Sequence, residues 1–302
     1  GGGAAGLIAA GSCANEGVET LILERNEKPA RKVMITGKGR CNVTNNCNSL
    51  QDLISNVPRN GRFLYGAFSR FMPCDVMDFF ESRGVELKTE RGNRVFPVSD
   101  NAAQITDALA AFAYRGSKVI KGRAVKLITD NGCVKGVETE DGEIIYADKV
   151  IIATGGLSYP GTGSTGDGYE LAKQAGHKIT ELKPSLVPLE IHEGFCTDLM
   201  GLSLRNTAIK VIDTESGKTI YTDFGEMLFT HFGVSGPVIL SASAHMRQME
   251  SGRYKVSIDL KPALTVEQLD ARILRDFSEN INRNFINALN SLLPKKLVPV
   301  IV

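Results

Sequence analysis

The chain of 302 residues has no tryptophan, no signal-peptide pattern and no long apolar run. A membrane-spanning helix needs roughly 18 or more consecutive apolar residues, and an exported protein begins with a charged and then apolar leader. The sequence therefore gives no support for a membrane or an exported protein. We expect a cytoplasmic protein.

Paired cysteines and clustered histidines are also missing. The cysteines form no C-x-x-C pair, so a redox-active disulfide is not expected, and their scatter suits reduced thiols in the cytoplasm. The histidines show no metal-ligand spacing, so no metal site is predicted. The residues concerned are Cys13, Cys41, Cys47, Cys74, Cys133, Cys196, His177, His192, His231 and His245.

The chain has almost no net charge: 35 Lys and Arg stand against 34 Asp and Glu, which gives +1. This balance offers no electrostatic reason to expect a nucleic-acid partner, so a small-molecule substrate is expected and the oligomeric state is left open. Contents of 42% hydrophobic and 23% charged residues are typical of a soluble globular protein. The length favours two domains.

Glycine, by contrast, is concentrated at the start of the chain. The opening Gly1-Gly2-Gly3-Ala4-Ala5-Gly6 fits the pattern G-x-G-x-x-G. In dinucleotide-binding folds the first glycine allows a tight turn, the second lets a pyrophosphate touch the backbone, and the third lets the helix pack closely. A helix is predicted over residues 4–15, and its first N–H groups would hold phosphate charge. Alone, the hexapeptide also suits a plain loop.

A short apolar run, residues 20–24, ends in Glu24, 18 residues after Gly6. An acidic residue near this offset hydrogen-bonds the adenosine ribose of a bound dinucleotide. A carboxylate there repels a 2′-phosphate, so this first site is expected to suit FAD or NAD and not NADP. The alternative is an exposed charge at the end of a strand.

The polar loop at residues 25–48 contains the segment Gly37-Lys38-Gly39-Arg40-Cys41-Asn42. Its glycines and short polar residues are atypical of a helix or a strand. Two glycines beside Lys38 and Arg40 could form a second anion-binding loop, and long loops within a domain are often functional. The alternative is a solvated basic loop.

Further along, residues 64–84 are expected to be helical, with Pro73 starting a second helix. Residues 85–98 are expected to form a hairpin, with Asp100 capping a helix over residues 102–114. Short strands are predicted at residues 124–129, 134–139 and 144–146 because Asp-Asn-Gly and Asp-Gly turns separate them. The apolar run at residues 149–153 predicts a buried parallel strand that leads into Thr154-Gly155-Gly156. A second G-x-G-x-x-G, at Gly161, Gly163 and Gly166, does not directly follow that strand. We interpret it as backbone that approaches a ligand held by the first glycine motif.

After Lys183-Pro184 the pattern changes to strands with short turns, followed by a charged helical tail over residues 265–293. We therefore predict a nucleotide-binding domain at residues 1–184 and a β-rich domain at residues 185–302. Residues 225–237 allow two interpretations. Ser235 and Pro237 suit the start of a helix, or Thr230, His231 and Ser235 face a cofactor or substrate.

Four segments carry a resemblance to a known family: GGGAAG at the start, GKGRCNVTN at 37–45, ATGGLSYPGTGSTGDGYELAKQAGH at 153–177 and GEMLFTHFGVSGP at 225–237. Together they resemble the BaiN-like, formerly YhiN-type, family of NAD(P)/FAD-dependent oxidoreductases, over nearly the whole chain. The strand end ATGG and the turn TGDG are also similar to those of fumarate-reductase-type flavoproteins.

The resemblance implies an α/β fold: a Rossmann-like FAD-binding domain of the glutathione-reductase or fumarate-reductase type, with a β-rich domain inserted in it. It further implies that Arg40, Cys41 and Asn42 lie near the flavin, Val125 near the adenine, and Thr154 to Gly156 beside the dinucleotide, with the segment 165–168 closing over it. The full set of expected cofactor-binding residues is Gly1, Gly3, Ala4, Ala5, Gly6, Glu24, Arg25, Lys32, Gly39, Arg40, Cys41, Asn42, Val125, Thr154, Gly155, Gly156, Thr165, Gly166 and Asp167.

The function expected is that of an FAD-dependent oxidoreductase that passes hydride between NAD(P)H, the flavin and an organic substrate or oxygen. His231 and Tyr159 are the candidate proton donors, and Cys41 is expected to be a packed thiol. Alternatives are an FAD-dependent tRNA-modifying enzyme and a non-catalytic FAD-binding sensor. Members of the family begin with a strand before the glycines and end in a flavin-contacting segment, so we expect that this chain is truncated at both ends.

Overall fold

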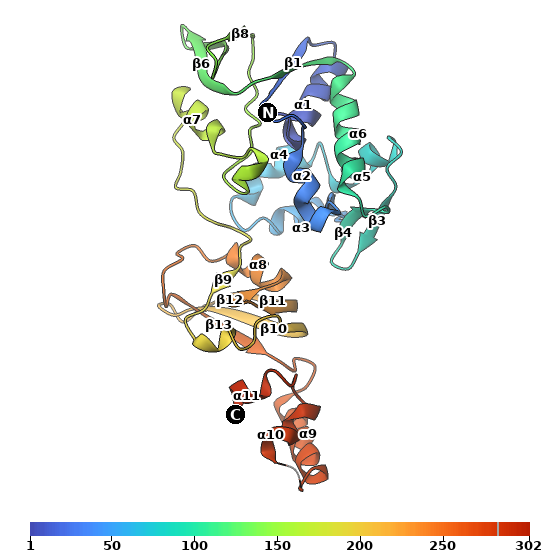
Figure 1. The fold of residues 1–302 in the computed structure, drawn as a ribbon, viewed down its shortest axis with the longest axis vertical. Coiled ribbons are helices and arrows are strands. Elements are labelled where there is room, and N and C mark those ends of the chain that lie inside the picture. The colour runs from blue at the N-terminus through green and yellow to red at the C-terminus, as the bar shows by residue number, and fades with distance from the viewer. Residues whose placement is uncertain (283) are drawn as a thin grey trace. The chain divides into compact units, whose positions relative to one another are not determined.

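The fold is that of a computed structural model, which describes residues 1–282 and 284–302 (Figure 1). The chain divides into two units, Gly1–Glu181 and Leu182–Val302. The predicted boundary at residues 184/185 lies three residues beyond this division. Each unit has its own hydrophobic core, so each is described by itself.

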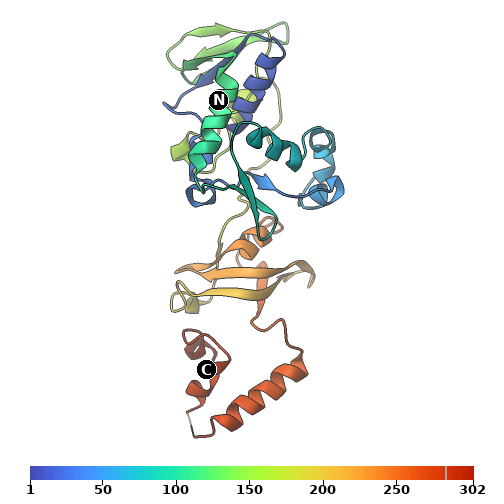
Figure 2. The ribbon, with the colours of Figure 1, turned by 90° about the vertical axis from the view of Figure 1, so that its right-hand side faces the viewer.

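Unit 1 is built around two parallel strands, β1 (Thr20–Glu24) and β5 (Ser117–Lys121), which pair in register from Thr20 with Ser117 to Glu24 with Lys121. Parallel strands require a long crossover connection, and here helix α6 (Ala102–Tyr114) leads into β5. Helix α1 (Ala4–Asn15) packs beside α6, as both Figure 1 and Figure 2 show. Leu7, Ile22 and Ile105 are buried in the shared core.

Two small antiparallel sheets complete unit 1, one with strand order β2-β4-β3 and one with the order β6-β7-β8. The other elements of this unit are α2 (Arg31–Ile35), η1 (Thr36–Gly39), β2 (Thr44–Asn45), α3 (Leu50–Ser55), η2 (Gly61–Leu64), α4 (Tyr65–Phe68), α5 (Pro73–Glu81), β3 (Leu87–Glu90), β4 (Arg94–Pro97), β6 (Ala124–Asp130), β7 (Cys133–Thr139), β8 (Ile144–Tyr146), η3 (Pro160–Thr162) and α7 (Asp167–Gln174).

Two local predictions for unit 1 are wrong. Residues 149–153 form no strand, because no neighbouring strand among the described residues offers them a ladder, and Ile151 is 62% exposed. The predicted cap Asp100 is displaced by its neighbour: Asn101 accepts from the N–H of Ala103 at the start of α6. Asp100 instead pairs with Lys88 and Arg40.

Unit 2 contains one five-stranded antiparallel sheet with the strand order β13-β10-β11-β12-β9. Alternating burial along β10 places Ile209 and Val211 in its core, against Met227 of β11 and Ile239 of α8. Its elements are β9 (Leu189–Glu190), η4 (Gly194–Cys196), β10 (Ser203–Asp213), β11 (Thr219–Phe229), β12 (Gly233–Ser235), α8 (Pro237–Ser243), β13 (Tyr254–Asp259), α9 (Val266–Glu279), α10 (Phe285–Ala288), η5 (Leu289–Ser291) and α11 (Val298–Ile301).

Candidate functional site

The opening glycine turn packs so tightly that two of its glycines cannot carry a side chain. A Cβ on Gly6 would lie 1.8 Å from the carbonyl oxygen of Gly1, and a Cβ on Gly1 would lie 2.7 Å from the carbonyl oxygen of Ala153. Gly3 differs: among the described residues, the nearest atom to a Cβ there would be the carbonyl oxygen of Ala153, at 4.0 Å. The space beside Gly3 is therefore open to a ligand.

The first turn of α1 leaves its N–H groups free. Gly3 precedes the helix with extended backbone and provides no side-chain cap. Within the described residues, no acceptor is found for the N–H groups of Ala4, Ala5 and Gly6, and Ala4 and Ala5 are exposed. Such free N–H groups, together with the helix dipole, favour a negatively charged ligand.

Glu24 lies directly against this turn. Its Oε2 accepts from the N–H of Gly2 at 2.6 Å, while its Oε1 accepts from the backbone N–H and from Nδ2 of Asn26, both at 2.7 Å. An ionised carboxylate has about four acceptor positions. These three bonds fix its orientation and leave capacity for a ribose hydroxyl.

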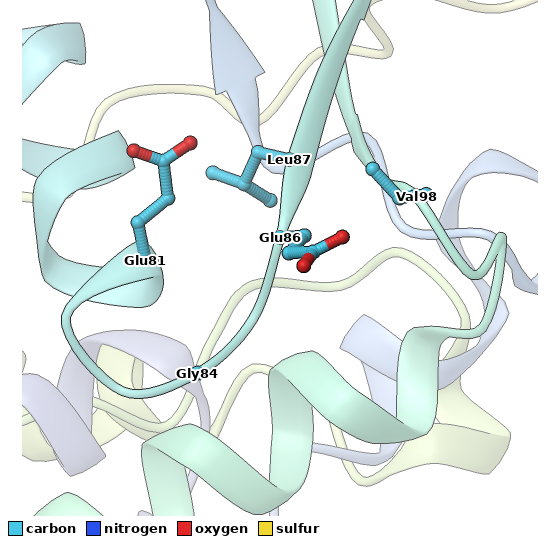
Figure 3. A pocket seen from close by; sticks show the side chains of 5 residues that line it. All are labelled: Glu81, Gly84, Glu86, Leu87 and Val98. Carbon is cyan, nitrogen blue, oxygen red and sulfur yellow. The ribbon is translucent and has the colours of Figure 1, made fainter.

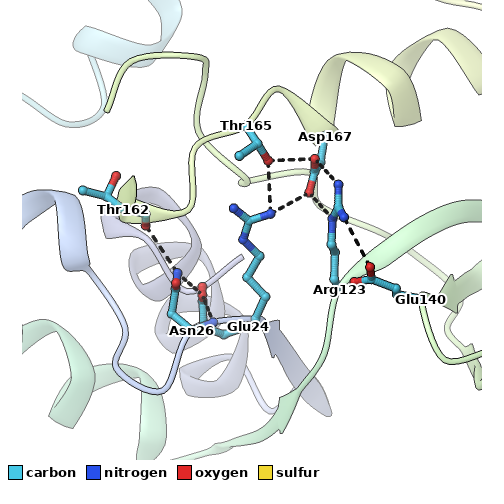
Figure 4. Close-up of polar contacts among 8 residues, drawn as sticks. Glu24, Asn26, Arg123, Glu140, Thr162, Thr165 and Asp167 are labelled. Carbon is cyan, nitrogen blue, oxygen red and sulfur yellow. Dashed lines mark hydrogen bonds and ion pairs between the residues drawn. The ribbon is translucent and has the colours of Figure 1, made fainter. Parts of the chain in front are cut away.

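A network of charges joins the end of β1 to the start of α7 (Figure 4). Arg123 donates to both oxygens of Asp167, at 2.8 and 2.9 Å, and Arg25 donates to Thr165 at 3.1 Å and to Asp167 at 3.4 Å. Hydrogen bonding by Arg123 holds the pKa of Asp167 below its ordinary value, with Thr165 and the charges of both arginines adding to the effect against a smaller opposing effect of burial.

Further bonds tie the loop at residues 157–168 to the segment after β1. Nδ2 of Asn26 donates to the carbonyl oxygen of Thr162 at 3.3 Å, and Nζ of Lys32 donates to Oγ of Ser158 at 3.1 Å. Gly163 has a φ of +103°, and a Cβ there would meet Nδ2 of Asn26 at 2.6 Å. The second glycine motif therefore serves the close approach of this loop to the end of β1.

Thr154, Gly155 and Gly156 lie between the glycine turn and the loop. A Cβ on Gly1 would lie 3.1 Å from Cα of Thr154, and a Cβ on Gly155, whose φ is +77°, would lie 2.7 Å from Oγ of Ser164. The N–H of Gly166 donates to the carbonyl oxygen of Gly156. Oγ1 of Thr154 is buried and has no hydrogen-bond partner among residues 1–282 and 284–302.

The segment expected near the flavin makes contacts within the protein. The guanidinium of Arg40 lies 4.1 Å from the ring centre of Phe96 and pairs with Glu90 and Asp100. Gly39 has a φ of +84°, and no atom of the described residues lies within 4 Å of a Cβ placed there. Asn42, with its amide oriented to suit its neighbours, donates to the carbonyl oxygens of Val95 and Thr44.

Cys41 is 4% exposed and has a φ of +61°. Burial raises the pKa of its thiol, against a smaller lowering by a hydrogen bond with Thr36. A buried neutral thiol is a poor nucleophile, and the side chain packs in the same core as Leu7 of α1.

The remaining candidates lie in different parts of the chain. Val125 is 40% exposed on β6, and its carbonyl oxygen accepts from Gln174 of α7. Tyr159 belongs to unit 1 and is 67% exposed, with a φ of +52°. His231 belongs to unit 2, where its exposed ring meets the edge of Phe232. Thr230 has a buried hydroxyl without a partner among the described residues.

A hollow of about 510 Å³ in unit 1 is lined by Glu81, Gly84, Glu86, Leu87 and Val98 (Figure 3). Its two carboxylates would repel a pyrophosphate, so it does not suit the dinucleotide. Nowhere in the described part of the chain do His, Cys, Asp and Glu gather in a group that could hold a metal ion. None of the described helices is long and apolar enough to cross a membrane.

The glycine turn, its open side at Gly3 and the adjoining Glu24 fit a bound dinucleotide, and the wider comparison agrees. Residues 1–252 match the family described as the HI0933-like protein Rossmann domain. The chain belongs to this family. The predicted fold class, a Rossmann-like FAD-binding domain, is confirmed, as is membership of an FAD-binding oxidoreductase family.

Curated relatives match along nearly the whole chain. The protein named ribosomal RNA dihydrouridine synthase of Escherichia coli (strain K12) is 30% identical, over 99% of this chain and 71% of that protein. The protein of the same name from Haemophilus influenzae (strain ATCC 51907 / DSM 11121 / KW20 / Rd) is 32% identical, over 99% and 71%. The 3-dehydro-bile acid delta(4,6)-reductase of Clostridium scindens (strain ATCC 35704 / DSM 5676 / VPI 13733 / 19) is 30% identical, over 99% and 72%.

Two residues of this site were not predicted from the sequence. Asn26 orients Glu24 and holds the loop, and Arg123 is the main partner of Asp167. Asn26 follows the ribose-binding position by two residues, and a short amide so close in the chain is able to donate to the carboxylate. For Arg123 no local signal exists, because its partner is 44 residues away.

Proposed function

We propose that this protein is a cytoplasmic FAD-dependent reductase. It takes hydride from NADH or NADPH and delivers it to a carbon–carbon double bond conjugated with a carbonyl group; a proton adds to the neighbouring carbon, and NAD(P)⁺ is released. The names of the relatives support this reaction class. Forming dihydrouridine from uridine and reducing a 3-oxo-Δ4,6 steroid both saturate such a double bond.

The observation that carries the proposal is the contact between the glycine turn and Glu24. The N–H of Gly2 donates to the carboxylate at 2.6 Å, so the pyrophosphate-binding and ribose-binding positions expected from the sequence are adjacent. In the proposal, the free N–H groups of Ala4, Ala5 and Gly6 hold the pyrophosphate, and the remaining acceptor capacity of Glu24 holds the ribose.

FAD, when bound, supplies the hydride chemistry that side chains cannot perform. The chain's own residues bind it, orient it and exclude water. Asp167 positions the loop at residues 157–168 by pairing with Arg123 and Arg25 from two other segments. Thr154 lies directly against the glycine turn, because a Cβ on Gly1 would be 3.1 Å from its Cα.

The reaction also needs one proton for the carbon next to the carbonyl group. Tyr159 and His231 remain the candidates, because each is exposed and can donate a proton. Tyr159→Phe and His231→Gln should each be tested for slower oxidation of the reduced flavin by substrate. The variant that lacks the proton donor should still be reduced by NAD(P)H at the normal rate. Only the oxidation of its reduced flavin by the substrate should be slower.

The test is spectroscopic. The purified protein loaded with FAD should show the two flavin absorption bands, bleach anaerobically with NADH or NADPH, and recover colour on addition of a uridine-containing RNA or a conjugated enone. Oxygen should also restore the colour, without any added substrate. Persistent colour with both reductants would contradict the proposal and favour an FAD-binding sensor, and failure to bind FAD would overturn both.

A further inference from the structure

The near-zero net charge of the chain conceals a strongly basic region. Residues 28–74 contain eight Lys and Arg but a single acidic residue, Asp52. Within them, residues 53–74 hold three arginines and no Asp, Glu or Lys. The rest of the chain is therefore net negative, and the positive charge is concentrated in one part of unit 1.

Aromatic residues alternate with these arginines over residues 59–71, which we call the arginine–aromatic segment. It spans η2 and α4, drawn in light blue in Figure 2 at the outer edge of unit 1. Three of its four aromatic residues are exposed: Phe63 by 87%, Tyr65 by 58% and Phe71 by 44%, whereas Phe68 is partly buried. Arg59, Arg62 and Arg70 are exposed as well.

The backbone holds this arrangement in place. Asn60 has a φ of +54°, and its carbonyl oxygen accepts from the N–H of Phe63 at 2.9 Å. A Cβ on Gly61 would lie 2.5 Å from the carbonyl oxygen of the buried Ile54, so the turn rests directly on α3. A hollow of about 560 Å³ opens beside Asn60, Gly61, Arg62 and Phe63.

None of the three arginines has an ion-pair partner, and none of the three exposed rings stacks on another ring or cation, within the part of the chain that the structure describes. Arg40 differs from them, because its guanidinium forms ion pairs with two carboxylates and lies over an aromatic ring. The arginine–aromatic segment thus presents free cations and free aromatic faces side by side.

We propose that the arginine–aromatic segment binds RNA, stacking its rings on unpaired bases while its arginines contact the phosphates. This inference rests on the proposed function, with a uridine in RNA as the substrate. Arginine is complementary to phosphate in charge and geometry, and exposed aromatic rings stack on bases of any sequence. A uridine must leave its stack before its double bond can be reached, and exposed aromatic rings give the flanking unpaired bases a surface on which to stack.

The experiment measures binding of a fluorescent oligouridylate by anisotropy at several salt concentrations. The wild-type protein should bind with a salt-dependent affinity. Phe63→Ala should weaken binding by about tenfold or more, and Arg62→Ala should reduce the slope of log K against log salt by about 0.7. Tyr146→Ala and Arg205→Ala, at an exposed tyrosine and an exposed arginine outside the segment, are the matched controls and should bind as the wild type does.

Melting temperature and flavin content are measured on every variant, so that loss of fold is separated from loss of contact. Absence of RNA binding by the wild type, or equal affinity of wild type and Phe63→Ala, would overturn the inference. So would a wild-type dimer that Phe63→Ala dissociates without any effect on RNA affinity. A protein that binds RNA through the segment but neither holds FAD nor oxidises NAD(P)H would refute the proposed function and leave the RNA-binding surface standing.

Discussion

Two groups of arginines in unit 1 differ in what surrounds them. Arg25 and Arg123 are held by Asp167 and fix the loop at residues 157–168. The arginines of the arginine–aromatic segment have no ion-pair partner in the described residues. The first N–H groups of α1 likewise have no hydrogen-bond acceptor there. Polar groups satisfied within the protein position the site, whereas unsatisfied ones are available to ligands. The following predictions test this distinction.

The largest effect on FAD affinity is expected at Gly3, where the space beside the backbone is open to a ligand. Gly3→Val should lower FAD affinity on the order of a hundredfold or more, because its side chain would occupy the path of the pyrophosphate. The melting temperature should change little, since the nearest atom of residues 1–282 and 284–302 to a Cβ there is the carbonyl oxygen of Ala153, at 4.0 Å. Flavin content measures the loss of FAD affinity, and thermal unfolding measures the melting temperature. Gly6→Val is the contrasting variant: its side chain would clash with Gly1, so it should unfold the protein.

Glu24 has both roles, so its removal should affect ligand and fold together. Glu24→Ala should weaken FAD binding by about 1.5–3 kcal/mol, the usual value of hydrogen bonds to a charged acceptor, and should leave the N–H of Gly2 unpaired. Glu24→Gln retains an acceptor and should lose less. Equal FAD dissociation constants for wild type and Glu24→Ala would show that the carboxylate has no part in binding.

Asp167 belongs to the polar groups that are hydrogen-bonded within the protein, so its replacement should lower the stability of the fold. Asp167→Asn should cost about 2 kcal/mol in the free energy of unfolding, because charge-assisted hydrogen bonds are replaced by neutral ones. The pKa of Asp167 is lowered in the folded protein, so its contribution is present above the ordinary value of 3.8 and is lost as pH falls through the folded value below it.

Chemical denaturation of wild type and Asp167→Asn across this range checks the prediction. The difference between them should be constant near neutral pH and shrink only in strong acid. A difference that grows on acidification would reverse the assigned sign.

The smallest effect is expected for Lys32, which was predicted to contact the cofactor. Its ammonium group donates to Ser158 in a solvent-exposed bond, and such contacts contribute less than about 1 kcal/mol. Lys32→Ala should change the FAD dissociation constant by less than about threefold. A tenfold loss would indicate a direct contact with the phosphates.

Sequence patterns predicted those elements that local signals determine. The helices at residues 4–15 and 102–114 and the strand at residues 20–24 have the predicted bounds, because short residues, periodicity and turns act over a few positions. The segment at residues 149–153 has the composition of a buried strand, but a strand also needs a neighbour to pair with.

The candidate site was predicted only in part for the same reason. The offset from Gly6 to Glu24 is a property of the chain, whereas the Arg123–Asp167 pair depends on tertiary structure that brings together residues 44 apart. The basic region at residues 28–74 was missed because charges were summed over the whole chain. A local count would have found it.

Hydrogen–deuterium exchange of the N-terminal peptide, with and without FAD, tests the central claim most directly. If the opening glycine turn grips the pyrophosphate, the amides of Ala4, Ala5 and Gly6 should exchange more slowly in the presence of FAD and return to the free rate in Gly3→Val. Unchanged exchange at these amides in a protein that holds FAD stoichiometrically would show that the flavin nucleotide binds elsewhere.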